Sequence, residues 1–93
     1  MVAPNHAYRI GRALQKVEDL LILTRATSKQ VIDALGEIQV IEEEEFGEIL
    51  EEVRSWIDYI KQYYKAISPL DSEDRKALLE DLESWSKKVE EII

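Results

Sequence analysis

The sequence predicts an all-α fold in which three antiparallel helices, the central one long, form a single domain over 1–93. Apolar residues recur every three to four positions along almost the whole chain, which is the period of an amphipathic helix. Three glycines and two prolines leave few positions that would end a helix. A chain of 93 residues is also the length of one domain rather than two.

The first helix is expected at about 4–24. Pro4 suits its first turn, where a missing backbone N–H costs nothing. Its apolar face is formed by residues spaced three or four apart, namely Ile10, Leu14, Val17 and Leu21.

The second helix is expected over 28–67. Thr27 and Gln30 have the spacing of a capping box, which marks its start, and Pro69 marks its end. Between these points the apolar stripe continues without a strong helix breaker. The alternative is a compact four-helix bundle bent near Glu42–Gly47, because Glu42 falls on the apolar stripe and a glycine follows the glutamate run.

The third helix is expected over 72–93, with Asp71 or Ser72 as its N-cap. Its apolar seam is Leu78, Leu82, Trp85, Val89 and Ile92. Short connections make neighbouring helices antiparallel, so the first and third helices would each cover about half of the long one.

This arrangement would leave part of the long helix uncovered, which favours a homodimer. The apolar face between residues 49 and 67 spans about 140°, wider than one antiparallel helix covers. A chain of this size also buries little surface by itself when elongated. The predicted interface is Ile49, Val53, Trp56, Tyr59, Ile60, Tyr63 and Ile67.

Composition bounds the function. Twelve basic and twenty acidic residues give a net charge of −8, and the absence of cysteine excludes disulfides and thiolate chemistry. No apolar run approaches the roughly 18 residues of a membrane span, and the first residues lack the apolar segment of a signal peptide. We therefore expect a cytoplasmic, non-catalytic interaction or assembly module that needs no cofactor and binds itself and another protein.

The first alternative function is weak nucleic-acid binding by the first helix. Arg9, Arg12 and Lys16 are spaced by three and four residues, so they share one helix face. The acidic charge of the whole chain repels phosphate, which would leave such binding weak and sensitive to salt.

The second alternative comes from seven glutamates within 42–52. Antiparallel register places Arg9 opposite Glu44, and Lys87 and Lys88 opposite Glu52 and Glu51, so these glutamates have candidate cationic partners. Glu44, Glu45 and Glu48 also form the pattern Glu-Glu-x-x-Glu. It is similar to the pattern of all-α nucleoside triphosphate pyrophosphohydrolases, a resemblance that implies Mg²⁺ bound by these carboxylates. That family has a downstream Glu-x-x-Asp, which this chain lacks.

Overall fold

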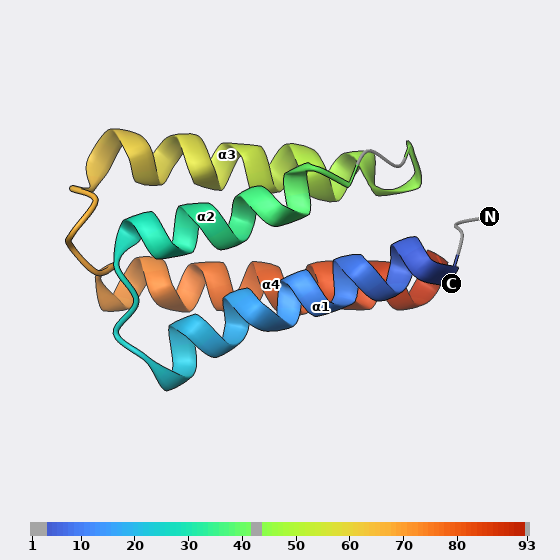
Figure 1. The fold of residues 1–93 in the computed structure, drawn as a ribbon, viewed down its shortest axis with the longest axis horizontal. Coiled ribbons are helices and arrows are strands. Elements are labelled where there is room, and N and C mark those ends of the chain that lie inside the picture. The colour runs from blue at the N-terminus through green and yellow to red at the C-terminus, as the bar shows by residue number, and fades with distance from the viewer. Residues whose placement is uncertain (1–3, 42–43, 93) are drawn as a thin grey trace.

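Four α-helices pack together in the part of the chain that the structure describes (Figure 1). The structure is a computed structural model, and it describes residues 4–41 and 44–92. The helices are α1 (Pro4–Leu23), α2 (Ser28–Gln39), α3 (Gly47–Tyr63) and α4 (Ser72–Ile92), and a single 3₁₀ turn, η1 (Glu44–Phe46), precedes α3.

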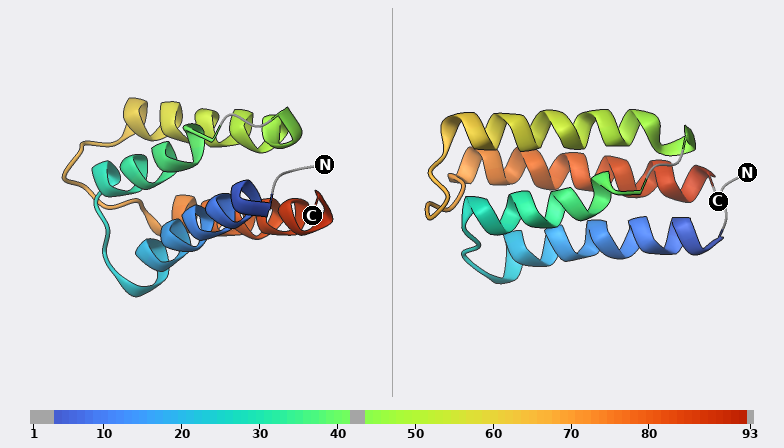
Figure 2. Two further views of the ribbon diagram at one scale, coloured as in Figure 1. Left: turned by 45° about the vertical axis from the view of Figure 1, so that its right-hand side comes forward. Right: turned by 45° about the horizontal axis from the view of Figure 1, so that its top comes forward.

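The helices run in alternating directions around one core. Helix α1 packs against α2 and α4, and α2 packs against α3. Large side chains join α3 to α4 through hydrogen bonds, so the order around the core is α1, α2, α3, α4 (Figure 2). The side of the bundle formed by α1 and α2 is therefore opposite the side formed by α3 and α4. The start of α1 and the end of α4 lie at the same end (Figure 1).

The expectation of one helix over 28–67 is wrong. Helix α2 ends at Gln39, and the chain turns back so that α3, which begins at Gly47, packs beside it. Of the bend predicted at Glu42–Gly47, residues 42 and 43 lie outside the described residues. The expected boundaries of the outer helices are confirmed to within one residue at Leu23 and Ile92.

Apolar burial explains why the chain turns back here. Ile41 and Phe46 flank the turn and are buried, so both close the end of the core. The side-chain amide of Gln39 donates a hydrogen bond of 2.6 Å to the Leu50 carbonyl, which links α2 to α3. Folding back lets both halves of the apolar stripe face one core, and this outweighs the helix propensity of the glutamates between them.

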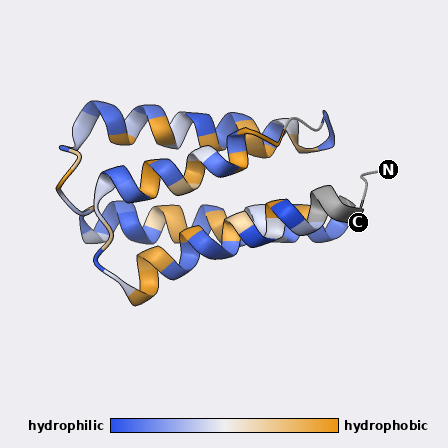
Figure 3. Cartoon of the chain, viewed as in Figure 1, coloured by the Kyte–Doolittle hydropathy of each residue, from blue (hydrophilic) through white to orange (hydrophobic). Residues whose placement is uncertain are grey.

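The core draws on all four helices and on both ends of the bundle. Its largest fully buried side chains are those of Trp85 and Phe46. Figure 3 shows hydrophobic residues recurring along each helix, with a further cluster around the last turn of α1. The cluster includes Ile22 and Leu23, which are exposed.

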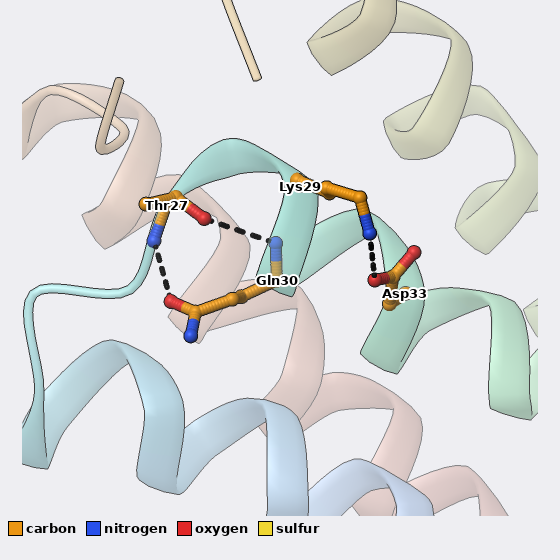
Figure 4. Close-up of polar contacts among 4 residues, drawn as sticks. All are labelled: Thr27, Lys29, Gln30 and Asp33. Atoms are coloured by element: carbon orange, nitrogen blue, oxygen red, sulfur yellow. Dashed lines mark hydrogen bonds and ion pairs between the residues drawn. The ribbon is translucent and has the colours of Figure 1, made fainter. Parts of the chain in front are cut away.

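The capping box predicted at the start of α2 is confirmed (Figure 4). The Gln30 backbone N–H donates to the Thr27 hydroxyl, and the Thr27 backbone N–H donates to the Gln30 side-chain oxygen at 2.9 Å. One turn further, Lys29 forms an exposed ion pair with Asp33. The two reciprocal hydrogen bonds satisfy two of the backbone donors that a helix N-terminus leaves unpaired.

Two other backbone donors and one hydroxyl at this end of α2 bind the connection between α3 and α4. The backbone N–H and the hydroxyl of Ser28 both donate to the Ser68 carbonyl, at 2.7 and 2.6 Å. The Lys29 backbone N–H donates to the Ala66 carbonyl at 3.1 Å. These bonds tie the two connections at this end together, and they leave the N-terminus of α2 without a donor for an anion.

Candidate functional site

The predicted basic face of α1 stays on the surface, and its three cations have different surroundings. Lys16 forms an ion pair of 2.8 Å with Glu37 of α2. The Arg12 guanidinium lies over the Tyr8 ring at 5.7 Å and donates to its hydroxyl. Neither arginine of this face has an acidic partner within 4–41 and 44–92, so the predicted pairing of Arg9 with Glu44 is not formed.

These cations line a groove between α1 and the end of α2, which we call the α1–α2 groove. It has a volume of about 860 Å³. Its residues include Tyr8, Arg9, Arg12, Leu23, Glu37 and Val40. The exposed fractions of Tyr8, Leu23 and Val40 are 65%, 75% and 69%, so the groove presents large apolar side chains to solvent.

The sequence indicated the cations of this groove but not its apolar part. Leu20 to Leu23 are apolar on every face of the helix, a pattern that is typical of a segment covered from more than one side. In the structure the outward side chains of this turn remain uncovered. Val40, the C-cap residue of α2, lines the groove and is exposed.

The proposed metal residues are separated by local structure and by ion pairing. Glu44 and Glu45 lie in η1 and Glu48 in the first turn of α3, so the three do not share one regular helix face. Glu48 pairs with Lys88 of α4 at 3.3 Å. Within the ranges that the structure covers, no three His, Cys, Asp or Glu side chains are grouped to hold a metal ion.

Lys88 also approaches Glu52, at 3.7 Å, so one lysine of α4 does reach the glutamate run. Its hydrogen bond to Glu48 and the charge of Glu52 raise the pKa of its ammonium group. Lys87, the second predicted partner, instead pairs with Glu83 of its own helix. The predicted antiparallel register of α3 and α4 is therefore close to the observed one, but the two lysines pair with other glutamates than predicted.

The predicted dimer interface divides into buried and exposed residues. Ile49, Val53 and Ile60 are buried in the core of the same chain, so a second copy would reach them only if the bundle opened. Tyr63 and Ile67 have exposed fractions of 65% and 82%. The remaining two, Trp56 and Tyr59, line a cleft between α3 and α4.

This α3–α4 cleft is formed by Ser55, Trp56, Tyr59 and Asp74, and its volume is about 370 Å³. The rings of Trp56 and Tyr59 stand nearly perpendicular, at 85°, with centroids 5.8 Å apart. The Tyr59 hydroxyl donates to the Asp74 carboxylate at 3.0 Å, which raises the pKa of Tyr59. The sequence analysis missed Asp74 in the lining of this cleft and Asp81, which accepts the Trp56 indole N–H, although the two are seven residues apart and so share a helix face.

Comparison of the chain with protein-family models, curated proteins and solved structures gives no match. Within the described residues, each helix is too short or too polar to cross a membrane.

Proposed function

We propose that this protein is a non-catalytic protein-interaction module whose α1–α2 groove binds an acidic, amphipathic segment of a partner protein. The observation that carries the proposal is the combination in this groove of exposed apolar side chains with Arg9 and Arg12, which have no acidic partner among the described residues. Exposed apolar residues gathered in one groove are typical of interaction sites.

Charge complementarity determines the kind of partner. The chain carries −8 overall, so most of its surface repels an acidic segment. Among the described residues, the groove contains three cations and two carboxylates: Glu37 pairs with Lys16, and Asp19 accepts from the Gln15 amide, so the lining keeps a net positive charge. Binding of an acidic segment is therefore favoured at this groove and disfavoured on the rest of the surface. The charges attract the segment and also fix where on the bundle it binds. Its apolar face would cover Leu23 and Val40.

The test uses the ¹⁵N-labelled full chain and two peptides of about 14 residues, roughly four helical turns. Both carry the same leucine face, and one has glutamate where the other has lysine. We expect the glutamate peptide to shift the amide signals of α1 and the end of α2. Replacing Arg9 and Arg12 by Gln should weaken binding at least about twofold, since each exposed pair contributes about 0.2–1 kcal/mol.

The matched control is Arg54→Gln, which removes a cation that lines the surface between α2 and α3 instead. Equal binding of both peptides, or an equal loss with Arg54→Gln, would refute the proposed groove. Leu23→Ser should also weaken binding, because it removes an exposed apolar contact.

Nucleic-acid binding is the second candidate, because Arg9, Arg12 and Lys16 all line one groove. A duplex oligonucleotide separates it from the first. If the cations bind phosphates, affinity falls by about 0.9 log units per contact for each tenfold rise in salt. We expect no oligonucleotide binding at about 50 mM salt, and a steep salt dependence that Arg9→Gln reduces by about 0.9 log units would favour this second function.

A homodimer remains part of the proposal, on the part of the stripe that stays exposed. Tyr63 and Ile67 lie at the α3–α4 connection and would form its contact. Sedimentation at about 10 µM tests it, since a micromolar Kd gives a mixture of monomer and dimer there. Tyr63→Ser should shift the distribution toward monomer. If the unmodified protein sediments entirely as a monomer at this concentration, the dimer is ruled out.

A further inference from the structure

We propose that the α3–α4 cleft is a binding site for a lysine or arginine side chain of a partner protein. The cleft lies on the opposite side of the bundle from the α1–α2 groove, and the inference does not depend on the function proposed for that groove. It rests on two aromatic rings and the Asp74 carboxylate, which line one small cavity, and on Asp81, which binds the indole of the first ring.

The aromatic rings form a corner. Trp56 and Tyr59 are one helical turn apart on α3, and their planes meet at 85°. Tyr63 continues the row one turn further, with its ring centroid 4.9 Å from that of Tyr59. An ammonium or guanidinium group in such a corner can face the negative π surface of one ring while its alkyl chain contacts the other.

Carboxylates of α4 hold the rings in place. The Trp56 indole N–H donates to Asp81 at 2.6 Å. Asp74 accepts from the hydroxyls of Tyr59 at 3.0 Å and Tyr64 at 2.5 Å. These are neutral donors, so each hydrogen bond orients a ring without neutralising the carboxylate that accepts it.

No cation of the described chain compensates these two carboxylates. Lys88 pairs with Glu48 and Glu52, and it lies seven residues, about two helical turns, beyond Asp81. The Arg75 guanidinium donates to the Leu70 carbonyl instead. A cation brought by another molecule therefore meets acidic groups that form no ion pair within the described chain.

The cleft is large enough to admit a single side chain. Its volume of about 370 Å³ is near the lower limit of small-molecule sites. It is bounded by Ser55 and Trp56 along α3 and by Asp74 across from them. A lysine or arginine side chain that projects from a partner surface would fit within it, whereas a whole helix, about 10 Å across, would not enter.

The two tryptophans of the chain allow a direct test by ¹H–¹⁵N spectroscopy of their indole groups. The Trp56 indole lines the cleft, and the Trp85 indole is buried and bonded to Glu52, so Trp85 is an internal reference. The probe is acetyl-Ala-Lys-Ala-amide, and its control is the same peptide with norleucine in place of lysine. We expect the lysine peptide to shift the Trp56 signal saturably, with a Kd on the order of millimolar.

Two variants should weaken this binding by about two- to fivefold, the effect of one exposed cation–π or charge contact. Tyr59→Leu removes one ring of the corner. Asp81→Asn removes a charge but keeps an oxygen that accepts the Trp56 hydrogen bond. The matched control is Asp58→Asn, which removes the same charge from the surface between α2 and α3.

Three results would overturn the proposal. They are an equal shift with the norleucine peptide, an equal loss with Asp58→Asn and Asp81→Asn, and no Trp56 shift at peptide concentrations of about 20 mM, well above the expected Kd. Far-UV circular dichroism confirms that each variant is folded before the titration. Because Tyr59 is 39% exposed, Tyr59→Leu should leave the helix content unchanged.

Discussion

The hydrogen bond between Trp85 and Glu52 should contribute measurably to the stability of the bundle. Trp85 of α4 is fully buried, and its indole N–H donates to the Glu52 carboxylate of α3 at 2.8 Å. Glu52→Ala removes this acceptor and leaves the donor buried without a partner. This substitution tests the α3–α4 contact specifically, because the two residues lie 33 positions apart in the sequence and meet only when these helices pack together.

The expected size of the effect follows from burial. A buried donor that loses its partner costs about 1–3 kcal/mol, so we expect Glu52→Ala to lower the free energy of unfolding by about 2 kcal/mol. Losing the ion pair with Lys88 adds less than about 1 kcal/mol, because that pair is partly exposed. Glu52→Gln retains an acceptor for the indole and should cost less than Glu52→Ala.

Urea unfolding measures the free energy of unfolding of each variant. It is followed by far-UV circular dichroism, because the variants change the fluorescence of Trp85 or remove it. In a double-mutant cycle with Trp85→Phe, the coupling between the two sites should be about 1–2 kcal/mol. The matched control is Glu51→Ala, which removes the neighbouring exposed glutamate and should stay within about 0.5 kcal/mol. Additive effects, or an equal cost for Glu51→Ala, would show that the bond does not stabilise the α3–α4 contact.

Three other predictions concern the turn, the cap and the response to pH. Phe46→Ala should cost about 3–5 kcal/mol in urea unfolding, because the ring is fully buried, while Tyr63→Ala, at an exposed site, should cost far less. Thr27→Ala should cost about 1 kcal/mol of stability and so lower the midpoint of thermal unfolding. Thr27→Ser keeps a hydroxyl that can accept the Gln30 hydrogen bond, so its midpoint should stay close to that of the unmodified protein. Burial and the hydrogen bond to Asp74 raise the pKa of Tyr64 above 10.0, the value of a free tyrosine. The free energy of unfolding should therefore be unaffected by ionisation of this group below about pH 10 and should fall as the pH rises further. Asp74→Asn should lower the pKa of Tyr64, which ultraviolet absorbance of the tyrosinate measures.

Much of the candidate site could not be predicted from the sequence. Arg9, Arg12 and Lys16 could be placed on one face because they belong to one helix. Tyr8 and Leu23 are on that helix too, but whether they are covered depends on what packs against it. Asp74 and Asp81 meet the aromatic residues of α3 only through the register of α3 and α4, which is set by long-range packing.

The sequence by itself determined where helices form and where most of them begin and end. The start of α2 after Thr27 and the start of α4 after Asp71 follow from side chains that bond backbone groups three residues away. Such signals act within one turn of helix, so they hold regardless of the remaining structure.

Only the tertiary structure decided that the chain turns back between α2 and α3. Locally, the glutamates after Ile41 favour a continued helix, and no proline or asparagine opposes it. The turn is decided by Phe46, Ile49 and Val53, which are buried against the rest of the chain only when α3 folds back onto α2. Burial of apolar surface depends on residues distant in the sequence, and its free energy exceeds the small differences in local helix propensity.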